Sequence, residues 1–407
     1  MVNRLVRHLR LTRSWWLRVL LVFVISRAVS VLFFLYCGSI EGGSYWNGPN
    51  PEYFDFLNVW DVEWFHRIFD NGYPTILPVD AVGAVQQNAW AFLPGFPYTV
   101  KVIAAITGLD WKFAAPLVST LSGYCLSLVA YKLFALRLSY RTSLWAVLLF
   151  NVSAAAPVLQ TGYSESLGLL FMALALYGWL TKRTFTLAIA LFCSSLTRPG
   201  MAAFGLAFAI VWVIHEFSNR LNTRRGVSLR YGEEDQLWLF LFACYALALN
   251  FIWPTIAFIA TGHINAYVST ELAWRIGYPD NGGGIIPLAQ WFSPAKYYAG
   301  PLLGTILVLS AIIGAVAFQF WRPLQVLGRE MRAWIIAYFA YLFAFFFPQS
   351  SIVRILMPTF VIFGAVAYAT EKWKPWQKGL LIAGSLILQL GWLLACWMYI
   401  PPDYSPP

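Results

Sequence analysis

The sequence predicts an all-α polytopic membrane protein, and three observations support this fold class. Of the 407 residues, 59% are apolar and 18% aromatic, but only 11% are charged, whereas soluble domains carry about 25% charged residues. Apolar runs of about 18 residues or more, long enough to cross a bilayer, recur along the whole chain. The basic residues lie in short clusters between these runs, as membrane topology requires. A single large soluble core would not explain such runs.

Eleven apolar segments are predicted to cross the membrane. They are 15–36, 113–135, 142–158, 163–180, 184–197, 199–215, 237–261, 299–321, 333–347, 352–370 and 379–399. A twelfth candidate, 92–107, contains Pro94 and Pro97 and leaves only about ten residues for a helix after them, which is too few to span a bilayer comfortably. We expect a re-entrant or surface-lying helix there. The alternative is a short true span, which would invert the next two helices.

Charge distribution predicts the topology. With the N-terminus in the cytoplasm and eleven crossings, the cytoplasmic loops collect 20 of the 28 Lys and Arg residues. The segment 41–80 holds seven of the 18 acidic residues and one basic residue, Arg67, and is therefore placed outside. The arginine-rich N-terminus lacks a small-residue cleavage site after the first apolar run, which indicates a retained first helix. The predicted organisation is one integral membrane domain, 1–407, with a first extracytoplasmic loop at 37–112 that carries interfacial or re-entrant helices, a basic cytoplasmic loop at 216–236 and an extracytoplasmic loop at 262–298.

Several classes of function are disfavoured by composition. The net charge of +10 comes from the short clusters between apolar runs, and no nucleic-acid-binding motif is present, so we expect no nucleic-acid partner. With four His and no spaced Asp/Glu cluster, no metal site is evident, and no cofactor is expected. The five Cys are scattered without CxxC spacing and are expected to be small buried apolar residues.

The first outer loop contains the densest group of chemically active side chains. In Trp60-Asp61-Val62-Glu63-Trp64-Phe65-His66-Arg67, two carboxylates and an imidazole lie among Trp and Phe residues that would sit at the headgroup level. At helical spacing, Asp61 shares a face with Phe65, and Trp60 shares one with Trp64. The pattern predicts a helix that lies on the membrane and presents a carboxylate. A solvated amphipathic loop helix is the alternative.

Three further charged residues lie at predicted outer ends of spans. Glu165 begins an otherwise apolar span, where a carboxylate is costly and therefore often functional, although a role at a helix N-terminus would also fit. Arg198, in the hinge Thr197-Arg198-Pro199, and Arg354 could each snorkel to lipid phosphate. Two arginines near an acidic loop are more typical of a receptor for an anionic lipid headgroup. A carboxylate base, phosphate-binding arginines and aromatic walls favour glycosyl transfer from a lipid-phosphate sugar.

The same residues form an ordered series of motifs. They are the loop from Trp60-Asp61 to Gly72-Tyr73, Phe92-Leu93-Pro94-Gly95-Phe96-Pro97, Gly162-Tyr163-Ser164-Glu165-Ser166, Thr197-Arg198 and, more weakly, Arg354-Ile355-Leu356. In this order and at this spacing the chain resembles the PIG-V family of multi-pass mannosyltransferases, named for the enzyme that adds the second mannose in GPI-anchor synthesis. The resemblance implies a GT-C fold, a polyprenyl-phosphate-mannose (dolichyl-type) donor, and Asp61 as catalytic base. The chain is shorter than the eukaryotic members and its 262–298 loop is compact, which favours a bacterial relative that mannosylates a lipid, glycan or protein.

The sequence therefore predicts an inverting mannosyltransferase that acts at the extracytoplasmic face of a bacterial plasma membrane, or of the ER membrane if the chain is eukaryotic. Asp61 is the predicted base, and Arg198 and Arg354 are the predicted ligands of the donor phosphate. The predicted pocket residues are Trp60, Glu63, Trp64, His66, Pro94, Phe96, Tyr163 and Glu165. Its expected partners are the lipid-linked donor, a glycolipid, glycan or protein acceptor, and membrane lipids. A lipid or solute transporter is an alternative, but it predicts broken helices in two matched halves, which we do not find in the sequence. A non-catalytic membrane subunit is the second alternative.

Overall fold

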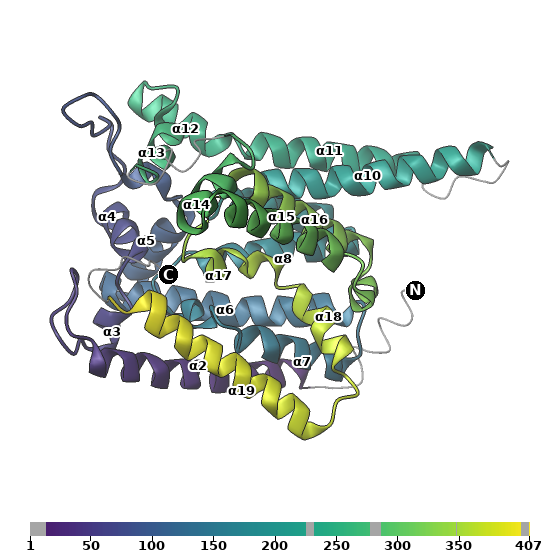
Figure 1. The fold of residues 1–407 in the computed structure, drawn as a ribbon, viewed down its shortest axis with the longest axis horizontal. Helices are drawn as coiled ribbons and strands as arrows, with labels where there is room; N and C mark the ends of the chain where they lie inside the picture. Colours follow the sequence, from purple (N-terminus) through teal and green to yellow (C-terminus); the bar gives the residue numbers. More distant parts are fainter. Residues whose placement is uncertain (1–13, 225–231, 277–285, 347, 400–406) are drawn as a thin grey trace. The chain divides into compact units, whose positions relative to one another are not determined.

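The computed structural model describes residues 14–224, 232–276, 286–346, 348–399 and 407, and its regular elements there are helices apart from one isolated bridge between Val79 and Val85 (Figure 1). The all-α prediction is confirmed for this part of the chain. Most of the N-terminal arginine cluster and parts of the predicted 216–236 and 262–298 loops lie outside the described residues.

The described chain separates into two compact units. The first unit comprises Met1–Tyr73, Phe92–Cys193 and Gln349–Pro407. Its helices are α2 (Trp15–Ile40), α3 (Tyr53–Phe56), α4 (Asp61–Asn71), α5 (Gly95–Thr107), α6 (Trp111–Ala135), α7 (Tyr140–Asn151), η2 (Ala156–Gln160), α8 (Glu165–Thr181), most of α9 (Thr184–Ser195), α17 (Ile352–Ile355), η5 (Met357–Thr359), α18 (Ile362–Ala369), α19 (Pro375–Trp392) and η6 (Leu393–Trp397).

The second unit comprises Pro74–Ala91 and Ser194–Pro348. Its helices are η1 (Ala89–Ala91), α10 (Met201–Arg224), α11 (Glu233–Leu249), α12 (Ile252–Thr261), α13 (Ala266–Ala273), α14 (Ala289–Ala299), α15 (Pro301–Phe318), η4 (Arg322–Leu327) and α16 (Arg329–Phe345). Helix α10 packs along α11 and α16, and α14 packs on α15 (Figure 1). Close packing of α10 depends on small and aromatic residues: a Cβ added at Gly205 would lie 2.8 Å from the Leu247 side chain, and the Phe204 and Trp334 rings are 4.2 Å apart.

Helix α6 is the central helix of the first unit, since it packs against α2, α5, α7 and α8. Small residues on α6 let these neighbours approach, as is usual where helices pack in membranes. A Cβ at Gly123 would lie 3.2 Å from the Leu159 carbonyl oxygen and 3.3 Å from the Phe23 ring. The turn between η2 and α8 is thereby held against α6, and this turn carries the residues Thr161 to Glu165.

Arg27, buried inside α2, is paired with backbone groups. Its Nη2 donates to the Asn151 carbonyl oxygen at 2.7 Å, and its Nη1 donates to the Ala156 carbonyl oxygen. The Asn151 carbonyl lies at the C-terminal end of α7, where a helix leaves its last carbonyls unbonded and carries partial negative charge. Ala156 is the first residue of η2. Arg27 therefore bridges the break between α7 and η2.

Six described helices or continuous helix pairs are long and apolar enough to cross a membrane, and a bent pair would make a seventh if it is one span. They are Trp15–Ile40, Trp111–Ala135, Met201–Leu221, Glu233–Thr261, Pro301–Phe318 and Pro375–Trp397, and the bent pair is Ile352–Thr359 with Ile362–Ala369. The chain is a multi-pass membrane protein, as predicted.

The predicted number of eleven spans is not confirmed. The predicted span 142–158 contains a break between α7 and η2, and the predicted span 352–370 bends by 77°. The segment 92–107 forms α5, which has 13 residues, fewer than the roughly 20 that an untilted span requires.

Candidate active site

Asp61 begins helix α4, the helix predicted around Trp60 to Arg67. Two acidic residues, Asp61 and Glu63, lie in its first turn, where the partial positive charge of the helix N-terminus stabilises carboxylates. The residue before Asp61, Trp60, has a φ of 61° and a ψ of −128°, which is rare for a residue with a side chain. The direction of Asp61 is thus set by a strained backbone at the start of the helix.

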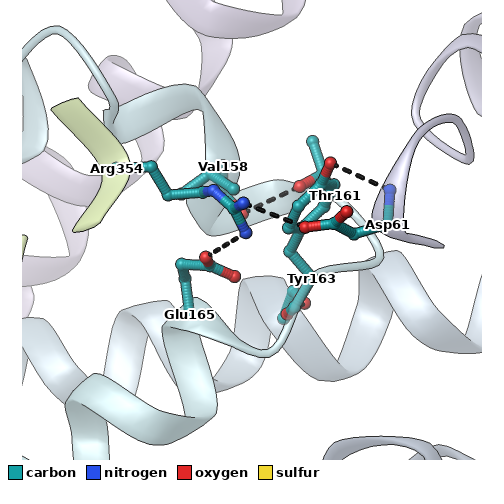
Figure 2. A network of polar contacts seen from close by, with 7 residues as sticks. Asp61, Val158, Thr161, Tyr163, Glu165 and Arg354 are labelled. Carbon is teal, nitrogen blue, oxygen red and sulfur yellow. Dashed lines mark hydrogen bonds and ion pairs between the residues drawn. The ribbon is translucent and has the colours of Figure 1, made fainter. Parts of the chain in front are cut away.

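A guanidinium joins Asp61 to the second predicted carboxylate. Arg354, on α17, donates from Nη2 to Asp61 Oδ2 at 2.9 Å and from Nη1 to Glu165 Oε1 at 2.7 Å (Figure 2). The side chains are 12% exposed for Arg354, 1% for Glu165 and 27% for Asp61. Of these three groups, Asp61 is therefore the one that a substrate reaches most easily.

Tyr163 completes this network. The backbone N–H of Asp61 donates to Tyr163 Oη at 3.3 Å, and the Arg354 guanidinium carbon lies 4.8 Å from the centre of the Tyr163 ring. The ring is fully buried, and Ser119 on α6 donates from Oγ to the Tyr163 carbonyl oxygen at 2.9 Å. Asp61, Tyr163, Glu165 and Arg354 come from three segments far apart in sequence, and the structure brings them together.

Gly162 lets the Thr161–Glu165 turn approach α4. A Cβ at Gly162 would lie 2.7 Å from Val62 Cγ1 and 3.2 Å from Asn58 Oδ1, and Val62 is fully buried. A valine branches at Cβ and has little freedom to rotate away. Any side chain at Gly162 must therefore move Val62, which is the neighbour of Asp61.

We expect Gly162→Ala to displace the start of α4 and to lower the free energy of unfolding by about 1–3 kcal/mol. Thermal unfolding in detergent measures this effect. Gly384→Ala is the matched control, because a Cβ there meets nothing within 4 Å. If the added methyl acts on Val62, the double variant Gly162→Ala, Val62→Ala loses less stability than the sum of the two single losses, because the two residues are in contact. Additive losses would exclude this contact as the cause.

The other residues predicted on α4 fix this helix against its surroundings. Glu63 accepts from Trp46 Nε1 at 2.8 Å and pairs with Arg67. Trp64 stacks on Phe92 with 5.8 Å between ring centres. His66 is exposed and stacks on Trp111 at 5.2 Å. These contacts hold Glu63, Trp64 and His66 against Trp46, Phe92 and Trp111 of the first unit.

The predicted pocket residues Pro94 and Phe96 lie at the start of α5. Pro94 precedes the first residue of that helix, and Phe96 is fully buried with its ring 5.4 Å from the ring of Phe65 on α4. These contacts pack α5 against α4. Phe96 thus supports the helix that carries Asp61, from its buried side.

Trp397 was not predicted, although it contacts two residues of the site. It accepts the indole N–H of Trp60 on its carbonyl oxygen at 2.8 Å, and its ring lies 5.5 Å from that of Tyr163. The two tryptophans are 337 positions apart, and an indole donating to a backbone carbonyl leaves no residue-specific signal in a sequence.

Arg198, the other predicted phosphate ligand, lies in the second unit between α9 and α10. Its charge acts there on Tyr341 of α16, which also faces the charge of Glu271 on α13. Tyr267, one helical turn before Glu271, donates a side-chain hydrogen bond to the Glu271 carboxyl group, and Arg275 donates to the Phe345 carbonyl oxygen at 3.1 Å. The second unit thus has a polar cluster of its own.

Burial raises the pKa of Glu271 from an ordinary value of 4.5 to about 7, against the opposing effects of Tyr267 and Arg275. The folded state then binds a proton more tightly than the unfolded state, so the contribution of Glu271 to stability is fully present below about pH 4.5 and declines as the pH rises through about 7.

Glu271→Gln should remove this decline, which amounts to at most about 3 kcal/mol because one pKa unit corresponds to about 1.4 kcal/mol. The measurement is the melting temperature in detergent at pH 5 and at pH 8. We expect the melting temperatures at the two pH values to differ less in Glu271→Gln than in the wild type. In Glu233→Gln, which changes an exposed carboxylate at the start of α11, they should differ as much as in the wild type. An unchanged pH difference in Glu271→Gln would contradict the assignment.

Among the described residues, no group of three or more His, Cys, Asp and Glu side chains is arranged to hold a metal ion.

Two solved structures of membrane proteins resemble the chain. The structure of ArnT from Cupriavidus metallidurans bound to undecaprenyl phosphate matches with a TM-score of 0.50 and 14% identity, and the match covers 93% of this chain and 64% of ArnT. The oligosaccharyltransferase of Archaeoglobus fulgidus, tethered to an acceptor peptide, matches with a TM-score of 0.46 and 14% identity over 97% of this chain and 56% of its own length. The chain thus spans less than two thirds of either protein.

The comparison with ArnT shows the fold: the chain has a GT-C fold, as the sequence predicted. A search with family models finds no match to the sequence, and a search of curated protein sequences finds none. The resemblance to PIG-V enzymes in particular is not confirmed.

Proposed function

We propose that the chain is a membrane glycosyltransferase that moves a sugar from a polyprenyl-phosphate carrier to an acceptor hydroxyl, with Asp61 as general base. The observation that carries the proposal is the placement of Asp61: it is the most exposed member of a buried carboxylate–guanidinium–carboxylate network at a helix N-terminus. The GT-C fold and the undecaprenyl phosphate held by ArnT support a polyprenyl-phosphate carrier.

The proposed reaction is a single displacement with inversion. The acceptor oxygen attacks the anomeric carbon as the bond from that carbon to the phosphate oxygen breaks. The hydroxyl proton passes to Asp61, and the polyprenyl monophosphate leaves with the bonding electrons. Arg354 favours the ionised form of Asp61, which must accept the proton, because a neighbouring cation stabilises a carboxylate. Glu165 shares the same guanidinium, so that part of the arginine charge is already balanced.

Arg354 has a carboxylate on each of its terminal nitrogens. We therefore propose that it positions Asp61. Arg198 is proposed as a ligand of the donor phosphate on the sequence motifs alone. Tyr163 and Trp60 pack beside Asp61 and fix its position. The remaining predicted pocket residues hold α4 in place or lie around it: Glu63, Trp64, His66, Pro94 and Phe96.

We further propose mannose as the sugar and the extracytoplasmic face as the side of catalysis. The motif series that resembles PIG-V enzymes supports the mannose, and the excess of acid in 41–80 supports the outward orientation. The compact 262–298 segment, in comparison with the eukaryotic enzymes of the resemblance, supports a bacterial plasma membrane and an acceptor that is a lipid, glycan or protein.

The proposal is tested with purified protein. Polyprenyl-phosphate-mannose is the donor, and membranes from a strain that lacks the gene for this chain supply the acceptor. We expect mannose in a new product and release of polyprenyl phosphate in equal amount, both measured by mass spectrometry. Polyprenyl phosphate carrying another hexose is the control for the sugar. Transfer of that hexose with no transfer of mannose would contradict the donor assignment, and no transfer of either would contradict the function.

One observation favours a transporter as the second candidate. Arg354 lies in the helix pair that bends by 77°, and broken helices with a charged residue are typical of substrate sites in transporters. Such a protein would move a lipid or solute across proteoliposomes and form no covalent product.

A further inference from the structure

The last helix of the first unit ends beside Asp61, although it contributes no group to the network. Helix α19 passes at residue Leu393 into η6, one turn of π-helix that ends at Trp397. Single π-helical turns are rare and occur frequently at functional sites. The carbonyl groups of the last turn of any helix lack partners within the helix. At Trp397 that partner is the indole of Trp60, at 2.8 Å.

The hydrogen bond to Trp397 helps to hold the strained backbone conformation of Trp60. A residue with a side chain in this conformation costs about 1–3 kcal/mol and persists only where its surroundings hold it. The Trp60 side chain is 8% exposed, and its ring lies 4.5 Å from Trp46 and 6.5 Å from Tyr399. Since Asp61 follows Trp60 directly, the conformation of Trp60 decides where Asp61 points.

Trp397 is itself held from several sides. The residue is 1% exposed, its ring lies 5.3 Å from that of Phe34 on α2, and its indole donates to the Phe56 carbonyl oxygen at 2.9 Å. Two residues further on, the backbone N–H of Tyr399 donates to Glu41 Oε2 at 3.2 Å, at the end of α2. The π-helical turn is therefore fixed to both ends of the 41–56 segment that leads to Trp60.

We propose that Trp397 and its π-helical turn are the positioning device for Asp61: they hold Trp60 in its strained conformation from one side and Tyr163 from the other. Trp397 contacts Trp60, the residue before Asp61, through its carbonyl oxygen, and through its ring it contacts Tyr163, whose hydroxyl accepts from the Asp61 backbone N–H. The inference rests on the proposed role of Asp61 as base. The last helix would then contribute to catalysis by positioning Asp61, without contacting the substrate.

The experiment compares Trp60→Phe and Trp397→Phe in the wild-type protein and in an Asp61→Asn background. Trp60→Phe removes the donor to Trp397, and Trp397→Phe removes the donor to Phe56. In the wild-type background we expect kcat to fall about 10-fold with KM for polyprenyl-phosphate-mannose within about 2-fold, because a small displacement of a catalytic group has effects of this order. In the Asp61→Asn background the residual kcat should not fall further, because residues that act through one group are not additive.

Trp334→Phe is the matched control for the loss of a fully buried indole, since Trp334 packs on Phe204 in the second unit. It should leave kcat unchanged. Equal losses of kcat in both backgrounds would show that the two tryptophans serve stability alone, and wild-type kcat in both variants would also overturn the inference. If Trp397→Phe does not fold, Trp60→Phe decides the matter. Full activity of Asp61→Asn itself would instead overturn the proposed function.

Discussion

Replacing Asp61 with Asn is expected to lower kcat by about 1,000-fold while KM for the lipid-linked donor changes little, since general-base catalysis contributes about 100- to 10,000-fold. Asparagine keeps the size of the side chain and an oxygen that can accept the bond from Arg354 Nη2. It lacks the charge and the basicity that the acceptor proton requires. The measurement is initial transfer of mannose from polyprenyl-phosphate-mannose at saturating donor.

Asp70→Asn is the control for this substitution. Asp70 lies in the last turn of the same helix, α4, and its side chain is 52% exposed beside His66. Its replacement removes one negative charge from the same loop without touching the network, so kcat should stay within about 2-fold, as is usual for surface substitutions away from a site. Retained transfer in Asp61→Asn would remove Asp61 from the mechanism, whereas equal losses in both variants would point to the charge of the loop as a whole.

The carboxylates of the network could be predicted from sequence, and their partner could not. Glu165 stands at the predicted outer end of an apolar span, where a charge is costly, and Asp61 stands among the Trp and Phe residues of the first outer loop; both settings are visible in the sequence. Arg354 was also visible as a costly charge. Its partners lie 293 and 189 positions away, however, and physical chemistry requires only that a buried guanidinium meet some anion. Lipid phosphate and protein carboxylate satisfy that requirement equally well.

Breaks within the helices were missed for a related reason. Hydropathy measures composition, and the segment 352–370 is apolar throughout most of its length. Pro358, in η5, lacks a backbone N–H and cannot continue an α-helix, and the helices on either side of this point bend by 77°. The bend places Arg354 on a short helix of its own, α17, from which it reaches two other segments. A hydropathy profile does not detect this bend, although the bend positions Arg354.

Replacing Arg354 with Gln is expected to destabilise the folded protein by about 3–5 kcal/mol, because removal of one partner leaves a buried charge without compensation. Glu165 is the group affected most, since its side chain is 1% exposed, while Asp61 at 27% can recover part of its solvation from water. The melting temperature in detergent measures this effect. The rate of transfer should also fall, because Asp61 loses the donor that fixes its carboxylate.

A second substitution separates the two losses. Adding Glu165→Gln to Arg354→Gln removes the uncompensated charge, so the melting temperature of the double variant should rise toward that of the wild type, a sign of coupling between groups in contact. Its kcat should stay as low as in Arg354→Gln, because Asp61 still lacks its guanidinium. If kcat recovered together with stability, Arg354 would serve the fold alone, and Asp61 would find its place without it. If neither recovered, the ion pair with Glu165 would not be the source of the instability, and the network would have to be held by the contacts of Tyr163 and Trp60 instead.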